Sequence, residues 1–202
     1  MKRIALFCLV SALVLAFCAC SGSDAPLSGA TTDESTYPQA LISPDAFSSF
    51  EEFEKHEKEA GEASVSKYYV PAAVPEGYAF AGITKRDGVY VAVHYLLPAD
   101  KLPSTEKLDS YGIERMTSLI CEYSLFADGT VSLNQFIQNG YKPIELDGKT
   151  YYHSTEYSTD AQTIGYEIVF LDEGQLIYLH LPAVDSFENM LKFVQVKPIY
   201  LK

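Results

Sequence analysis

Apolar and polar residues alternate along three stretches of the chain, residues 89–97, 119–125 and 164–170. A period of two places successive side chains on opposite faces of a strand, so each stretch predicts a β-strand with at least one buried face. The alternating apolar positions are Val89, Val91, Val93, Tyr95 and Leu97; Leu119, Cys121, Tyr123 and Leu125; and Ile164, Tyr166, Ile168 and Phe170. The pattern from residue 65 onward therefore favours a sheet.

Pairs of an acidic residue and glycine separate these runs. Asp-Gly between alternating segments is a strong signal for a β-hairpin. The turns predicted in this way are Asp87-Gly88, Asp128-Gly129, Asp147-Gly148 and Asp172-Glu173-Gly174. Four hairpin turns indicate an antiparallel meander rather than a parallel α/β sheet.

Three segments have helical spacing instead. Residues 44–59 carry an apolar stripe of phenylalanines at 47, 50 and 53, begin after the capping residue Ser43 and end before Gly61. Residues 132–140 predict a short helix, and residues 185–195 predict a C-terminal amphipathic helix with a capping-box spacing between Asp185 and Glu188. The expected fold class is α+β: a curved antiparallel meander with an N-terminal and a C-terminal amphipathic helix packed on it.

The N-terminus has a different pattern. A basic start, Met1-Lys2-Arg3, precedes an apolar run that ends at Cys18 and is too short to span a bilayer. A Ser- and Gly-containing stretch follows. This arrangement is typical of a secretory signal peptide, whereas a buried core helix rarely has such flanks.

The segment "LAFCACSGSD" resembles the lipobox of bacterial lipoproteins, in which small residues precede a cysteine that becomes the lipidated N-terminus. Cys20 follows Ala19 and fits this requirement, whereas Cys18 follows the bulky Phe17. Phe17 also occupies the position where leucine is usual, which is a departure from the pattern. The resemblance implies a signal peptide over 1–19, lipid attachment at Cys20 and an anchor on the extracytoplasmic side of the cell membrane.

The segment 20–40 is rich in Ser, Thr, Gly, Asp and Pro and predicts a disordered tether, so that residues 41–202 form one domain. Cys121 is then the one cysteine left for the domain, which excludes an intramolecular disulfide. A domain of this size buries roughly 70% of its unfolded surface and needs no covalent staple.

The chain is acidic, with a formal net charge of −12. Loss of residues 1–19 removes Lys2 and Arg3 and no acid, and leaves −14. Such a chain is repelled by nucleic acid and by anionic lipid, so we expect no nucleic-acid partner and a membrane attachment through acyl chains alone.

A wider resemblance rests on "VPEGYAFAGI", "IELDGKTYY" and the closing "SFENMLKFVQ". These segments look like extracytoplasmic lipoprotein domains of Gram-positive-type bacteria, which form a domain of unknown function. More distantly they are similar to the half-barrels of lipoprotein carriers and envelope-stress regulators. The resemblance covers roughly residues 68–197 and implies a fold and a location, but no catalytic residue.

Motifs for catalysis are weak. Ser-x-x-Lys occurs at 64–67 and at 104–107, without the companion motifs of the penicillin-binding enzymes. His56-Glu57 begins the zincin pattern, but Ala60 stands where the second histidine is needed. Cys121 lies among apolar residues, which predicts an unreactive buried thiol. We therefore expect no enzyme activity, no metal and no cofactor.

Tyrosines and histidines share strand faces: Tyr90 with His94, and Tyr178 with His180. The opposite faces of both strands are apolar, so these should pack on the helices and leave the tyrosine and histidine sides on a more open face. We predict that His94 and His180 are partly exposed on a surface for binding. The simpler interpretation is that tyrosine suits a half-exposed strand.

Two functions follow from these observations. The first is a membrane-anchored binding or sensing module for an envelope protein, peptide, glycan or lipid headgroup. The alternative is a cell-envelope hydrolase with an unrecognised active site.

Overall fold

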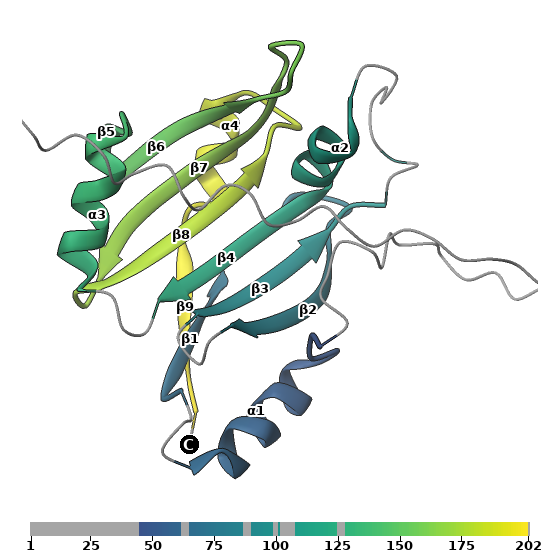
Figure 1. Cartoon of the computed structure of the whole chain (residues 1–202), viewed down its shortest axis with the longest axis vertical. Helices are drawn as coiled ribbons and strands as arrows, with labels where there is room; N and C mark the ends of the chain where they lie inside the picture. The colour runs from purple at the N-terminus through teal and green to yellow at the C-terminus, as the bar shows by residue number, and fades with distance from the viewer. Residues whose placement is uncertain are drawn as a thin grey trace, which may run out of the picture. The chain divides into compact units, whose positions relative to one another are not determined.

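A seven-stranded antiparallel sheet is the centre of the fold (Figure 1). The computed structural model describes residues 45–61, 65–86, 90–98, 101, 108–124 and 128–201. The signal peptide, Cys20, the tether, Ser43, the Asp87-Gly88 turn and Ser104 lie outside these residues. The predicted α+β class with a large antiparallel sheet is confirmed.

Two hairpin series build this sheet, and they meet at the β4–β8 pair. The strand order is β2-β3-β4-β8-β7-β6-β5, and every neighbouring pair is antiparallel. The strands are β2 (Ala79–Arg86), β3 (Tyr90–Leu96), β4 (Ser118–Ser124), β5 (Lys142–Leu146), β6 (Lys149–Tyr157), β7 (Thr163–Asp172) and β8 (Gln175–Pro182). The chain thus passes from β4 to the far edge strand β5 and returns strand by strand to β4.

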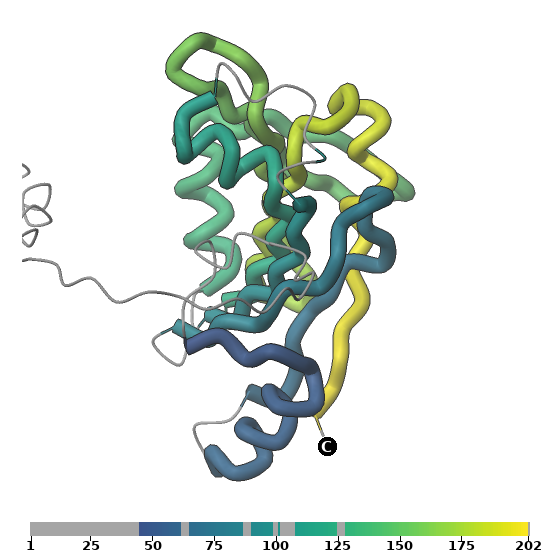
Figure 2. Tube along the Cα trace, turned by 90° about the vertical axis from the view of Figure 1, so that its right-hand side faces the viewer, coloured from purple at the N-terminus to yellow at the C-terminus, as the bar shows by residue number. Residues whose placement is uncertain are grey.

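A second, two-stranded sheet covers one face of the large sheet. It pairs β1 (Lys67–Pro71) with β9 (Val196–Tyr200), and β1 contacts β3 and β4. The short helix α4 (Phe187–Met190) and a following 3₁₀ turn, Leu191–Phe193, lie on the same side (Figure 2). Two further helices, α2 (Ser110–Thr117) and α3 (Gly129–Gln138), lie on the opposite side.

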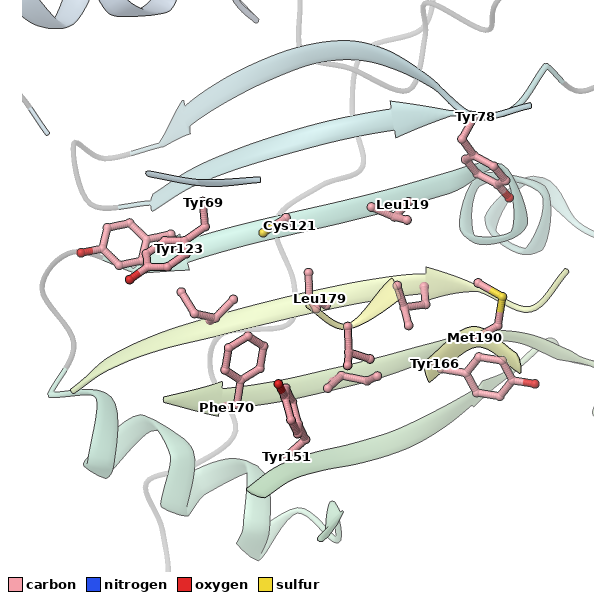
Figure 3. Packing of buried hydrophobic residues seen from close by; sticks show 14 of the residues in the cluster. Tyr69, Tyr78, Leu119, Cys121, Tyr123, Tyr151, Tyr166, Phe170, Leu179 and Met190 are labelled. Carbon is pink, nitrogen blue, oxygen red and sulfur yellow. The ribbon is translucent and has the colours of Figure 1, made fainter. Parts of the chain in front are cut away.

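The main core lies between the large sheet and the β1/β9/α4 side. The alternating apolar residues of the strands form this core. Leu119 and Cys121 of β4 and Leu179 of β8 point to that side and are almost completely buried (Figure 3). Ile168 of β7 belongs to the same buried cluster. Tyr69 from β1 packs against Tyr123 with ring centroids 5.0 Å apart. The apolar sides of the strands therefore face the C-terminal helix, as predicted.

The predicted N-terminal helix is shorter than the pattern suggested. Helix α1 runs over Phe50–Glu59, because Ser49 is its N-cap and its side chain accepts a hydrogen bond from Glu52 N. Phe47 lies before the helix, where its backbone bridges to Ile83 of β2. The phenylalanine stripe is nevertheless used, since Phe53 is fully buried in a second apolar cluster and Phe47 and Phe50 pack against that cluster.

Two of the predicted hairpin turns are confirmed. Asp147 and Gly148 have φ of 52° and 76°, and Glu173 and Gly174 have φ of 50° and 80°. Two successive positive φ values are typical of the tight type I′ turn that matches strand twist. Each turn joins directly hydrogen-bonded strands, β5–β6 and β7–β8.

The prediction of a hairpin turn at Asp128-Gly129 is wrong. Asp128 is the N-cap of α3, and its carboxylate accepts hydrogen bonds from Thr130 N and Val131 N. Gly129 is needed for packing, because a Cβ there would lie 2.3 Å from Gly174 O. The helix predicted over 132–140 is real but begins three residues earlier.

Two further elements differ from the sequence prediction. The C-terminal helix is one short turn of α-helix capped by Ser186 and continued as 3₁₀, because the chain must extend into β9 at Val196. Helix α2 was not predicted at all. No helix in the described part of the chain is long and apolar enough to cross a bilayer.

Candidate functional site

The four tyrosines and histidines chosen from the sequence lie on one face of the large sheet. In the β3–β4–β8 register His94, Ile120 and His180 stand side by side, Glu122 is opposite Tyr178, and Tyr90 is opposite Ser124. Strand β4 separates β3 from β8, so the two histidine backbones are roughly 10 Å apart at about 4.8 Å per strand. The alternation thus placed all four side chains on one face.

That face is only partly open: His94 is partly exposed, as predicted, whereas His180 is buried, contrary to the prediction. Helices α2 and α3 pack across it, over β7 and β8 (Figure 1). His180 is 0% exposed and lies under α2, not under the C-terminal helix. The expectation of a free sheet surface failed because the two covering helices come from the long connections on either side of β4.

His153 does not join the other histidines. It lies on the opposite face of β6, where its ring stacks on Phe187 of α4 with centroids 4.4 Å apart. His94 is half-buried, and its Nε2 is 2.9 Å from Thr84 Oγ1. Burial lowers the pKa of His94 to about 4, so this histidine is neutral at pH 7.

A buried ionic cluster fixes α2 to the sheet. His180 Nε2 donates to the backbone oxygen of Arg115 over 2.7 Å, and His180 Nδ1 is 2.9 Å from Glu156 Oε2. This Nδ1–Oε2 contact is short, but its geometry is not that of a hydrogen bond. The Arg115 Nε and Nη2 atoms each lie 2.9 Å from the same Glu156 oxygen. Burial alone would raise the pKa of Glu156, but His180 and Arg115 outweigh it and hold that pKa below its usual range.

The same arginine also holds the phenol of Tyr178. Arg115 Nη2 donates to Tyr178 Oη over 3.1 Å, and Tyr178 in turn donates to Glu167 Oε1 over 2.6 Å. Tyr141 donates to the other oxygen of Glu167. Burial raises the pKa of Tyr178, so the phenol is a neutral, fully engaged group at pH 7. Its hydrogen-bonding capacity is used within the cluster, and it offers a ligand its ring.

Gly165 makes room for this cluster. It lies on β7 between β6 and β8, and a Cβ there would lie 2.2 Å from His180 Cε1 and 2.7 Å from Glu156 Oε2. Any larger residue would have to displace the imidazole or the carboxylate. The close contact between His180 and Glu156 therefore depends on this glycine.

A pocket of about 470 Å³ lies beside the cluster, between α3 and the β2–β3–β4–β8 part of the sheet. This volume is within the usual range of small-molecule sites, roughly 300–1,000 Å³. Two of the four sequence candidates, Tyr90 and Tyr178, are among its walls. Its described lining is Arg86, Tyr90, Glu122, Ser124, Ser132, Gln135, Phe136, Leu176 and Tyr178.

The polar groups in this pocket are only partly satisfied. Ser124 Oγ is buried without a hydrogen-bond partner among the described residues. Glu122 contacts one described cation, Arg86, at 4.0 Å, and burial raises the pKa of Glu122 despite the opposing effect of that arginine. The Arg86 guanidinium lies over the Tyr90 ring, 4.8 Å from its centroid. The pocket thus holds hydrogen-bonding capacity that the described residues do not use.

A smaller pocket of about 240 Å³ on the other side of the sheet differs in this respect. Of the two carboxylates in its described lining, Asp172 accepts from Tyr69 Oη over 2.7 Å and from Lys149 Nζ over 3.2 Å, and Asp147 accepts from Gln195 Nε2 over 3.3 Å. Both carboxylates are engaged by described residues, which makes this pocket the weaker candidate.

Sequence reasoning missed the charged members of this site. Glu122 and Glu167 stand at the alternate positions of otherwise apolar strands, between Cys121 and Tyr123 and between Tyr166 and Ile168. A carboxylate inside a strongly alternating strand was the available signal. Arg115 was missed because α2 was not predicted.

The other sequence candidates have structural roles. Cys121 is a free, buried cysteine, and burial raises the pKa of its thiol, in agreement with the predicted unreactive state. Glu57 of the His56-Glu57 pair accepts from Val65 N and from Lys85 Nζ, so it ties α1 to the sheet. The described residues contain no group of three or more His, Cys, Asp or Glu side chains placed to hold a metal ion.

Comparison with known proteins found no match to this chain among family models, curated proteins or solved structures. The resemblance to lipoprotein domains therefore stays a prediction, and the functional argument rests on the geometry of the site.

Proposed function

We propose that this protein is a membrane-anchored bacterial lipoprotein whose extracytoplasmic domain is a binding or sensing module. The lipobox-like segment ending at Cys20 supports the anchor, and the pocket between α3 and the sheet supports the binding role. We place the ligand in this pocket, with Tyr90 and Tyr178 as two of its walls.

One observation carries the binding role: the pocket combines a buried, unpartnered hydroxyl with a partly desolvated carboxylate. Leaving a buried polar group unsatisfied costs about 1–3 kcal/mol, and a ligand that supplies the missing partner recovers that cost. Ser124 Oγ is such a group, and Glu122 beside it is partly desolvated with one described cation, Arg86, at 4.0 Å. A pocket of this kind is stabilised by a polar ligand.

The described lining favours binding over hydrolysis. A serine nucleophile needs a base within hydrogen-bond reach, oriented by a third group. Ser124 and Ser132 are the serines of the described lining, Ser124 Oγ has no hydrogen-bond partner among the described residues, and none of the nine described lining residues is a histidine, lysine or cysteine. The buried histidine His180 is instead held by Arg115 and Glu156 beneath α2.

Replacement of Cys20 tests the anchor. In Cys20→Ala we expect that signal removal and lipidation fail together and that acylation of the mature N-terminal peptide is lost in mass spectrometry. Cys18→Ala is the matched control, because Ala is also a small residue and the lipobox-like spacing to Cys20 is kept. An unmodified mature N-terminus at any other residue of the wild-type chain contradicts the anchor.

Blocking the pocket tests the binding role. Ser132→Trp places a large ring in the pocket from α3, whereas Asn134→Trp on the same helix points away from the described lining. We expect a panel of amino acids, saccharides and nucleotides to contain a compound that raises the Tm of full-length wild type and Asn134→Trp, but not of Ser132→Trp. If every stabilising compound acts equally on Ser132→Trp, the ligand site is elsewhere.

A further inference from the structure

We propose that the pocket binds a free α-amino acid with a large apolar side chain, held as a zwitterion between Arg86 and Glu122. This inference rests on the proposed binding function and names the ligand class. Glu122 receives the ammonium group, Arg86 receives the carboxylate, and the side chain lies among the rings of Tyr90, Phe136 and Tyr178.

Charge balance is the first argument. The described lining of the pocket contains one cationic and one anionic side chain, Arg86 and Glu122, with 4.0 Å between Nη2 and Oε2. A ligand with only an ammonium would leave the arginine unpaired, and a ligand with only a carboxylate would leave the glutamate unpaired. A zwitterion replaces one ion pair by two, so both protein charges keep a partner.

The existing pair is easy to open. The Arg86 side chain is 66% exposed, and its contact with Glu122 is at the outer limit of an ion pair. Exposed ion pairs contribute about 0–1 kcal/mol, so the cost of separating them is small. The guanidinium then presents its planar fork of donors to a carboxylate, for which it is the best-suited side chain.

The remaining groups fit an apolar amino acid. Phe136 and Tyr178 pack near each other, with centroids 6.4 Å apart, and Leu176 completes an apolar wall. The Tyr178 phenol is engaged by Glu167 and Arg115, so this wall is rigid. Ser124 Oγ, buried and without a described partner, is a further donor for the ligand carboxylate.

A saccharide is the competing ligand, because it also suits aromatic walls and hydroxyl groups. It carries no charge, so it would leave the pair of Arg86 and Glu122 in place. Its affinity would therefore depend little on either charge, and this difference separates the two ligands by experiment.

The test removes each charge once from the ligand and once from the protein, using titration calorimetry on the full-length chain in detergent. The probes are L-phenylalanine and L-leucine, with N-acetyl-L-phenylalanine lacking the ammonium and L-phenylalanine amide lacking the carboxylate. We expect wild type to bind L-phenylalanine about tenfold or more tightly than either derivative, since each loses a charge-assisted hydrogen bond.

Each charge variant should lose affinity only for probes that carry the opposite charge. Glu122→Gln should weaken binding of L-phenylalanine about tenfold or more but should not weaken binding of N-acetyl-L-phenylalanine, which has no ammonium for Glu122 to hold. Arg86→Gln should weaken binding of L-phenylalanine but not binding of the amide, which has no carboxylate for Arg86 to hold. An unchanged Tm in both variants shows that folding is intact.

Three results overturn the inference. They are failure of wild type to bind either amino acid, equal binding of L-phenylalanine and its two derivatives, and equal losses for all probes in both charge variants. If a chitooligosaccharide binds instead and Ser132→Trp abolishes that binding, the inference fails while the proposed function stands. If L-phenylalanine binds Ser132→Trp as well as it binds wild type, the pocket itself is wrong.

Discussion

At the scale of single residues, the site is determined by charged side chains at the strand positions that alternate with the apolar core residues. Glu156, Glu167 and Glu122 all lie on the face covered by α2 and α3. Arg115 forms ion pairs with Glu156 and Glu167, whereas the exposed Arg86 is the cation beside Glu122. Glu156 and Glu167 are thus structural, and Glu122 is available to a ligand.

Stability should depend on pH through Glu156. His180 from β8, Arg115 from α2 and Tyr111 from α2 face this carboxylate. Its pKa is lower in the folded chain than the usual 4.5. A depressed folded pKa gives stability that is present above the unfolded pKa and is lost as pH falls through the folded value.

We therefore expect Glu156→Gln to lower the free energy of unfolding at pH 7 by about 1–3 kcal/mol, because Arg115 loses its charged partner. As pH falls from about 5 to about 3, the difference in the free energy of unfolding between variant and wild type should become smaller. Urea unfolding at several pH values measures this difference at pH 7 and its decrease in acid. A constant gap across this range would show that the Glu156 charge contributes nothing to stability.

At the scale of elements, three strands and the covering helix α3 were predictable from the sequence, whereas helix α2 and the docking of both helices on the sheet were not. Alternation over several residues with Asp-Gly turns located β3, β4 and β7 because one face of each is buried. Helix α2 has only eight residues, includes Gly112, and turns a charged residue, Arg115, toward the sheet. Met116 is its one buried large apolar residue, so its apolar stripe is too short to reveal the helix in the sequence.

Asp128-Gly129 shows a second limit of sequence patterns. The same dipeptide that closes a hairpin at Asp147-Gly148 caps a helix here, since aspartate favours both positions. Only the contact of Gly129 with the backbone of Gly174, distant in sequence, decides between them. The position of α3, which forms one wall of the pocket, therefore depends on long-range packing.

The docking of α2 should depend on Arg115. In Arg115→Leu, Glu156 and Glu167 lose their shared cation in a largely buried setting, where removing one partner costs about 3–5 kcal/mol. We expect a loss of this order in urea unfolding and faster amide exchange in α2. Glu114→Gln, on the same helix, should be near wild type. Equal exchange in Arg115→Leu and wild type would show that packing alone holds α2.

At the scale of the whole fold, the two hairpin series depend on one joint. Series β2-β3-β4 and series β8-β7-β6-β5 are hydrogen-bonded to each other only at β4–β8 among the described strands, through four residue pairs. The main core crosses this joint, because Leu119 and Cys121 of β4 pack with Ile177 and Leu179 of β8. The apolar pattern of each strand was readable from the sequence, but their pairing was not, since β4 and β8 are far apart in the chain.

Cys121 reports on this joint. It pairs with Leu179 at the centre of the β4–β8 ladder and is 1% exposed, and burial raises the pKa of its thiol. A thiol reagent needs an exposed thiolate, so labelling requires the core between the large sheet and the β1/β9/α4 side to open over Cys121. Because residues of both series share this core, we expect the opening to be the same event as global unfolding.

The measurement is the labelling rate of the peptide containing Cys121, followed by mass spectrometry in increasing urea. The free energy of opening derived from labelling should equal the free energy of global unfolding from circular dichroism, and should fall with urea at the same slope. A mutation on either side of the joint that destabilises the fold should accelerate labelling by the same factor. Arg115→Leu provides this check, since it acts through β6, β7 and β8 rather than through β4. A smaller opening free energy with a shallower slope would mean that the core over Cys121 opens while the rest of the fold remains, and that the joint is not part of one cooperative core.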